Sequence, residues 1–208
     1  LRDLVTRTRG WVLCYVGRSD EGVPLLREAV EAAEGAEIDP LGLMRISGAL
    51  EWLDRSRDAY RYTLRDVGQA REDGAVGLLP YLLYQEAWHA CRAGLLSEAF
   101  AAASEGLGLA RELDLWLPRL QSLLVLAAIT ARRGTEAEFL AYFDEVEAPL
   151  EETGLVGYRV LLAHSRGLLA VSLSRHEDAV RELETVAKSL DEFGIHSRVS
   201  VPRSELAV

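Results

Sequence analysis

Positive charge is scarce in this sequence of 208 residues, which has a formal net charge of −10 and a single lysine, Lys188. A domain that binds nucleic acid directly usually carries a basic patch, because neutralisation of phosphates supplies most of the affinity. We therefore expect no direct contact with DNA or RNA. Long apolar runs are also missing. No stretch approaches the about 18 consecutive apolar residues of a transmembrane helix, so no membrane association is expected.

The sequence also lacks the motifs of metal sites, cofactor sites and enzymes. It contains no HExxH, CxxC, GxSxG or GxGxxG pattern, and His176 has no second histidine at helical spacing. Neither catalysis, nor metal binding, nor a cofactor is therefore expected in this segment. Several carboxylates gather at positions 145–152, but no base accompanies them. We interpret them as a solvated helix face.

A repeat is the main feature that the sequence does contain. The residues expected near the start of every second helix are spaced by 37, 40, 40 and 40 positions: Gly22, Ala59, Ala99, Phe139 and Ala179. Twelve residues before each of them lies a small residue: Gly10, Ser47, Ala87, Ala127 and Gly167. Two small residues at this spacing allow antiparallel helices to cross closely. Only Phe139 departs from the pattern, and a wider crossing is expected there.

Helix ends follow the same period. Second helices are expected to end near Gly35, Gly74, Asp114, Gly154 and Gly194, since glycine commonly follows a helix in the left-handed conformation. Apolar residues recur at i, i+3 and i+4, as amphipathic helices require. First helices are predicted at 3–16, 41–54, 78–93, 117–133 and 156–173. Second helices are predicted at 20–34, 57–73, 97–113, 136–152 and 176–192.

These helices predict an all-α fold, a right-handed superhelical solenoid of about five antiparallel pairs. Single pairs cannot bury their apolar faces, whereas stacked pairs share a continuous core. We therefore expect one domain over residues 1–208. Pro202 repeats the placement of Pro40, Pro80 and Pro118 at the openings of first helices. This suggests a truncated sixth repeat and an excerpt from a longer protein, whose open end at Leu206 allows a possible homodimer.

Cys14 and Cys91 occupy the same repeat position, two units apart. With neighbouring helices about 10 Å apart, their sulfurs should lie about 20 Å apart. A disulfide needs Cα atoms within about 7 Å. We therefore predict two free thiols in a reducing cytoplasm.

A binding groove is expected on the concave face, which the first helices of such solenoids line. Tryptophan, tyrosine and arginine dominate binding hot spots. The residues predicted to face this groove are Trp11, Tyr15, Met44, Trp52, Tyr81, Tyr84, Trp88, Arg92, Arg132 and His164. Such a surface suits a small apolar ligand or an amphipathic peptide helix. The alternative is that the aromatic residues, Trp11 and Trp52 above all, fill gaps between repeats. His89 is expected to point away from the groove as a packing residue.

The register of Ala87, Gly94 and Ala99 resembles the tetratricopeptide repeat (TPR), although the period is near 40 and not about 34. Together with RHEDAVRELE at 175–184 and the segment 192–206, the long period is similar to a known family. That family is the helical-repeat region of large ATP-binding LuxR-type (MalT-like) bacterial transcriptional regulators.

This resemblance implies a role in signal sensing for transcription regulation. The segment would bind a protein or small-molecule inducer and control a flanking ATPase domain and a flanking helix-turn-helix domain. ATP would belong to the flanking domain, because this sequence has no GxxxxGK[ST] loop. The alternative is a TPR-type adaptor or scaffold for protein–protein interaction, unrelated to transcription.

Overall fold

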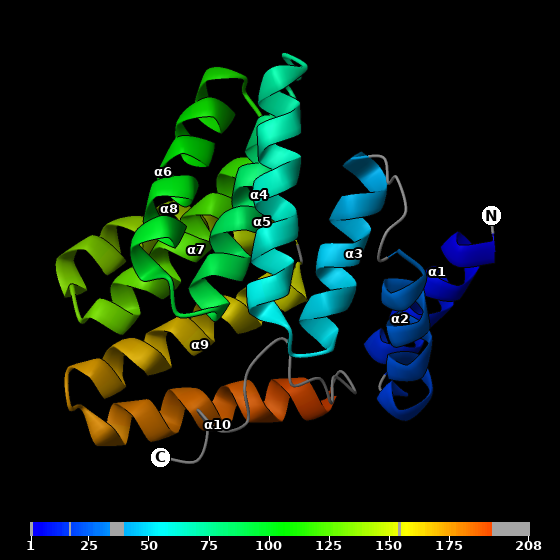
Figure 1. Ribbon diagram of the computed structural model, residues 1–208. Coiled ribbons are helices and arrows are strands. Elements are labelled where there is room, and N and C mark those ends of the chain that lie inside the picture. Colours follow the sequence, from blue (N-terminus) through cyan, green and yellow to red (C-terminus); the bar gives the residue numbers. More distant parts are fainter. Residues whose placement is uncertain (1, 17, 34–39, 154, 193–208) are drawn as a thin grey trace.

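The computed structural model describes residues 2–16, 18–33, 40–153 and 155–192. These ranges form ten α-helices and no strand (Figure 1). The helices are α1 (Arg2–Tyr15), α2 (Ser19–Ala33), α3 (Pro40–Trp52), α4 (Ser56–Glu72), α5 (Leu79–Arg92), α6 (Leu96–Glu112), α7 (Trp116–Arg133), α8 (Glu136–Thr153), α9 (Val156–Ser172) and α10 (His176–Glu192). The all-α prediction is confirmed, and each predicted helix end lies within two residues of the observed one.

The helices stack as antiparallel pairs into a superhelical solenoid. Each odd-numbered helix packs against its even-numbered partner, and α7 lies against α5, α6, α8 and α9. Figure 1 shows the helix direction rotating along the stack, from the upright α3, α4 and α5 to α9 and α10, which run across one end. Among the described residues, no helix is both long and apolar enough to cross a membrane.

The turns repeat with the same period as the helices. Left-handed backbone, with φ between +54° and +81°, occurs after first helices at Asp54, Gly94, Gly134 and Ser174 and after second helices at Gly74 and Asp114. The predicted caps Gly74 and Asp114 are thus confirmed, whereas Gly35, Gly154 and Gly194 lie outside the described residues. Aspartate and serine at three of these turns explain why a search for glycine alone misses part of the pattern.

Small residues mark the helix crossings, as predicted. Ala59, Ala87, Ala99, Ala127 and Ala179 are all fully buried. At Gly22, an added Cβ would lie 2.6 Å from the backbone oxygen of Gly10, so α1 and α2 touch through their backbones. Phe139 is also buried, and its ring centroid lies 5.6 Å from that of Phe143.

The two cysteines are free and buried, as predicted. Burial raises the pKa of the Cys14 thiol. A raised pKa keeps the thiol protonated and unreactive. Cys14 therefore acts as a small apolar residue of the core.

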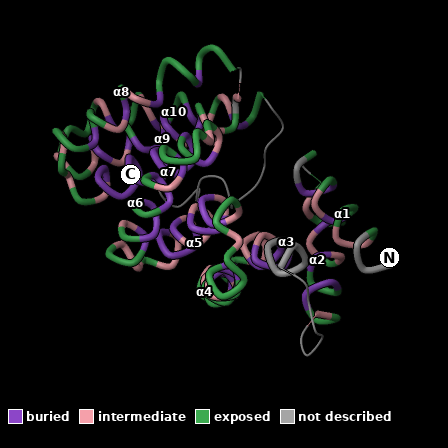
Figure 2. The backbone as a smooth tube through the Cα atoms, turned by 90° about the horizontal axis from the view of Figure 1, so that it is seen from above, coloured by how far each residue is buried: buried purple, intermediate pink, exposed green. Residues whose placement is uncertain are grey.

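The core of the described residues is not continuous, which corrects the expectation of one unbroken core. A central cluster runs from Val67 to Leu169. A separate cluster surrounds Leu26 and Leu50 near the N-terminal end, and a third consists of Val160, Val186 and Leu190. Figure 2 shows buried residues on the sides of the helices that face one another and exposed residues on the outer sides, for example on α4 and α8.

Asp66 lies in α4 between the first two clusters. Other repeats hold Ala29, Gly106, Val146 and Val186 at this position, all of them buried. The carboxylate of Asp66 is fully buried and has no hydrogen-bond partner among the described residues. Burial raises its pKa to about 7, although the charge of Arg65 acts in the opposite direction. A polar group thus interrupts the core where the repeat calls for an apolar one.

Candidate functional site

Glu51 organises the concave face where α3 meets α5. Trp88 Nε1 donates a hydrogen bond to Glu51 Oε1 at 2.5 Å, and Arg92 Nε lies 3.4 Å from the same oxygen. The Glu51 and Arg92 side chains are only 13% and 12% exposed. Because solvent screens a sheltered pair less than an exposed one, this contact orients Trp88 and Arg92 firmly.

His89 lies beside this cluster as a packing residue. Its side chain is buried, with 3% exposure, as expected from its helical phase. Its Nε2 lies 3.7 Å from Glu51 Oε2, because Glu51 reaches across from α3. The phase of α5 alone does not show that contact.

A shallow pocket continues this cluster across three first helices. It is lined by Trp88, Cys91 and Arg92 of α5, by Leu124, Ala128 and Arg132 of α7, and by Leu161, His164 and Ser165 of α9. Four residues predicted for the groove, Trp88, Arg92, Arg132 and His164, thus meet in one place. The guanidinium of Arg92 lies 5.9 Å from the Trp88 ring centroid, and Arg132 donates to the Ala128 carbonyl.

The size and charge of this pocket limit what it can hold. Its volume is about 20 Å³, close to the space of one water molecule. Sites for drug-sized ligands measure roughly 300–1,000 Å³. The lining carries two arginines and no carboxylate, in a chain of net charge −10. The pocket is therefore suited to anchoring one side chain or terminal group of a larger partner.

The other predicted groove residues lie elsewhere. Tyr81 and Tyr84 are half-buried on α5. Trp11 and Trp52 pack against the N-terminal cluster, and a Cβ on Gly48 would lie 2.5 Å from the Trp11 ring. Their placement matches the alternative of packing between repeats. The side chains of Tyr15 and Met44 lie outside the described part of the chain.

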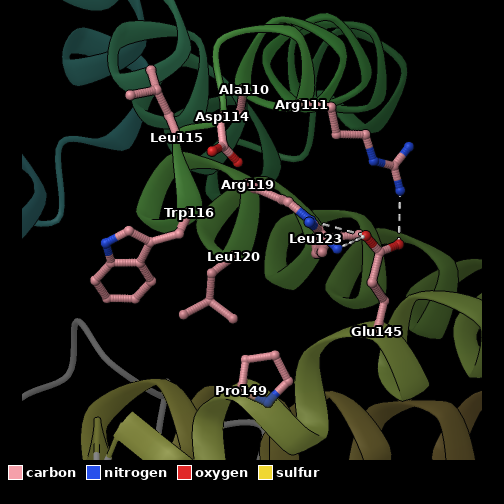
Figure 3. A pocket seen from close by; sticks show the side chains of 10 residues that line it. All are labelled: Ala110, Arg111, Asp114, Leu115, Trp116, Arg119, Leu120, Leu123, Glu145 and Pro149. Carbon is pink, nitrogen blue, oxygen red and sulfur yellow. Dashed lines mark hydrogen bonds and ion pairs between the residues drawn. The ribbon is translucent and has the colours of Figure 1, made fainter.

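A second hollow was not predicted from the sequence. It lies where α6, α7 and α8 meet, measures about 230 Å³ and includes Trp116, whose side chain is 58% exposed (Figure 3). Glu145 accepts from Arg111 at 2.7 Å and lies 2.9 Å from Arg119. The repeat period offers one indication of this hollow. Val76 lies one repeat before Trp116, at the same repeat position, and is also an exposed apolar residue.

Comparison with known proteins identifies the fold. No family model matches the chain, and no curated protein matches it. The structure is similar to that of a Rap protein complexed with competence and sporulation factor, with a TM-score of 0.60 and 13% identity. The alignment covers 99% of this chain and 63% of the Rap chain.

Two structures of a Podosopora anserina kinesin light chain with nearly identical TPR-like repeats are also similar. Their TM-scores are 0.57 and 0.56 at 14% identity, over 92% of this chain and 95% or 96% of theirs. Identities this low establish the architecture only. The chain thus has a TPR-like repeat fold.

Proposed function

We propose that the chain is a TPR-like protein-interaction module, and that it binds a segment of a partner protein along α5, α7 and α9. The observation that carries this proposal is the convergence of Trp88, Arg92, Arg132 and His164 on one pocket. Such convergence of aromatic and guanidinium groups is typical of binding hot spots. The Rap protein, which shares the fold, was solved in complex with a factor, and this offers a structural precedent.

The lining also indicates the chemistry of the partner. Arg132 supplies guanidinium donors to a pocket whose lining contains no carboxylate, whereas Arg92 already lies against Glu51. An acidic side chain or a terminal carboxylate would therefore be favoured beside Arg132. Trp88 offers an aromatic wall beside the two arginines. The small volume favours a peptide group over a free small-molecule inducer.

A display library of random 12-residue peptides would test this proposal. We expect selected peptides to be acidic and to bind Arg132→Gln at least tenfold more weakly than the original chain. A tenfold loss corresponds to about 1.4 kcal/mol, within reach of one charge-assisted hydrogen bond. Arg133→Gln is the matched control, because Arg133 is exposed and donates to the Leu96 carbonyl. Unchanged binding to Arg132→Gln would contradict the proposal.

The narrower role as the sensor of a LuxR-type regulator stays a prediction from the sequence resemblance. It requires a phosphate-binding loop and a helix-turn-helix domain in the flanking parts of the parent protein. Sequencing the surrounding open reading frame tests it directly. If both domains are absent, the adaptor function alone remains.

A further inference from the structure

Ion pairs join successive even-numbered helices at one repeat position. Arg71 near the end of α4 lies 2.7 Å from Glu105 of α6, and Arg111 near the end of α6 lies 2.7 Å from Glu145 of α8. Arg111 lies 40 residues after Arg71, and Glu145 lies 40 residues after Glu105, so the two pairs are one full period apart. We call this series the arginine–glutamate ladder.

The ladder stops between α8 and α10. One period after Arg111 and Glu145, the sequence holds Glu151 and Thr185, which cannot form an ion pair. Both residues line a groove of about 400 Å³, whose walls come from α8, α9 and α10. The packing of α8 against α9 is also sparser than that of α4 against α5 or of α6 against α7. The missing pair thus coincides with an opening in the stack.

The groove has an apolar floor. It is formed by Phe143, Leu150, Val160, Leu162, Ala163 and Val186. Arg166 crosses one end, 5.5 Å from the Phe143 ring centroid and 2.9 Å from Glu182. The charge of Arg166 is therefore already neutralised. Arg159 of α9 and Glu192 of α10 also line the groove, so its remaining charges are the carboxylates of Glu147, Glu151 and Glu192 and the single guanidinium of Arg159.

The α8 wall of the groove is strongly acidic. The helix carries seven carboxylates and neither lysine nor arginine. Glu147, Glu151 and Glu152 stand in its last two turns, where negative charge opposes the helix dipole. Among the described residues, neither Glu147 nor Glu151 has an ion-pair partner. These charges weaken the helix locally. A cation supplied by a partner protein would offset that cost.

We propose that this groove is a second docking surface, which holds an amphipathic helix of a partner protein. The apolar side of that helix would cover the floor, and its lysines or arginines would face Glu147 and Glu151. A cation of the partner would then lie next to Glu151. Arg71 of α4 and Arg111 of α6 occupy the same repeat position as Glu151, so the partner would supply the positive charge that α8 lacks there. A helix of about 14 residues is about 21 Å long, which fits along the 18 residues of α8.

Charge also separates this occupant from the alternatives. A second copy of the chain carries the same net charge of −10 and would be repelled by the acidic wall. An acidic segment of the kind expected on the concave face would be disfavoured for the same reason. The two surfaces therefore select partners of opposite charge.

The test uses displayed helical peptides of about 14 residues, with apolar residues fixed at i, i+3, i+4 and i+7 and the other positions random. The intact chain is the target. The central variant is Glu151→Arg with Thr185→Glu, which supplies the missing ladder pair and closes the groove. Glu177→Gln changes the net charge by the same +1 at an exposed position of α10 and is the matched control. Circular dichroism verifies that each variant is folded.

We expect the enriched peptides to be basic, to bind the closed variant at least tenfold more weakly and to bind Glu177→Gln within twofold of the original chain. Glu147→Gln with Glu151→Gln, which keeps the groove open, should weaken binding about fivefold. Binding to Arg132→Gln should not change, which separates this surface from the concave one. Three results would overturn the proposal: no enrichment of basic peptides, equal binding to the closed variant, or displacement of the peptides by a second copy of the chain.

Discussion

The helices α7 and α1 show how differently one kind of amphipathic sequence behaves at the centre and at the end of a stack. Every residue of α7 from Leu120 to Ala131 is buried, because four helices surround it. In α1, by contrast, Val5 and Val12 are 60% and 54% exposed. This helix packs chiefly on α2 and touches α3 through Trp11. The number of neighbours, and not the helix itself, sets how much apolar surface is removed from water.

The central core also differs from the two ends of the stack at its boundaries. On its N-terminal side the core ends at the buried carboxylate of Asp66, and on its C-terminal side at the open groove beside Glu151. The central repeats are therefore packed more tightly to one another than to either end. The following predictions test that difference.

The largest effect is expected from truncating a central side chain. Leu126→Ala in α7 should lower the free energy of unfolding by about 4 kcal/mol, because the cavity is enclosed on all sides. Leu13→Ala in α1 should cost about 2 kcal/mol, since the end of the stack can relax. Urea denaturation followed by circular dichroism measures both. Equal losses would show that the end helix is as constrained as the centre.

Asp66 should make stability depend on pH. Its folded-state pKa of about 7 exceeds the ordinary aspartate pKa of 3.8, so the folded state binds the proton more tightly than the unfolded state does. Stability is therefore highest below about pH 4 for this group and falls as the pH rises to about 7. At about 1.4 kcal/mol per pKa unit, a difference of about three units corresponds to a loss on the order of 4 kcal/mol.

Asp66→Val should remove this pH dependence and raise stability at pH 8, because Val146 and Val186 fill the same position in other repeats. Urea denaturation at pH 5 and pH 8 checks both statements. Asp144→Asn, on an exposed face, is the control and should leave the pH profile unchanged. A lower stability of Asp66→Val at pH 8 would contradict the account of an unpaired buried charge.

Glycine substitutions should separate close crossings from open surface. Gly22→Ala should destabilise the chain by about 2 kcal/mol, because the new Cβ would lie 2.6 Å from the Gly10 carbonyl oxygen. Gly68→Ala should stabilise it by about 0.5–1 kcal/mol, since its Cβ would meet nothing within 4 Å. Thermal unfolding of the two variants gives the comparison. The account of the α1–α2 crossing fails if both changes have the same sign.

The smallest effect concerns the arginine–glutamate ladder. Glu145→Gln removes the contacts with Arg111 and Arg119 and should cost about 0.5–1 kcal/mol, because these arginines are half exposed. The closed variant, Glu151→Arg with Thr185→Glu, should gain about 0.5 kcal/mol. Both effects should shrink at high salt. A salt-independent change in melting temperature would point to packing as its cause.

Much of the architecture follows from local patterns. The 40-residue period, the helix ends and the small residues at the crossings are encoded by residues close together in sequence. Backbone conformation at a turn such as Gly94 depends on neighbours along the chain. The two free cysteines follow from the same repeat spacing. Hence these features could be predicted without knowing how the repeats rotate against one another.

The candidate site was only partly predictable. Helical phase places Trp88 and Arg92 on one face, and His164 on the corresponding face of a later helix. It does not show that Glu51 reaches between Trp88 and His89. Nor does it distinguish Trp11, which lies on Gly48, from a residue that lines a pocket. Trp116 was missed because it precedes the apolar stripe of its helix.

The sequence by itself thus determined the all-α repeat, its period and its helix boundaries, since each depends on contacts within one or two helices. Only the tertiary structure decided that Trp88, Arg92, Arg132 and His164 share a pocket, that Asp66 is buried without a partner, and that the ladder opens after Glu145. These features depend on the angle and spacing between successive repeats. Those quantities arise from packing between side chains about 40 residues apart, which no local pattern contains.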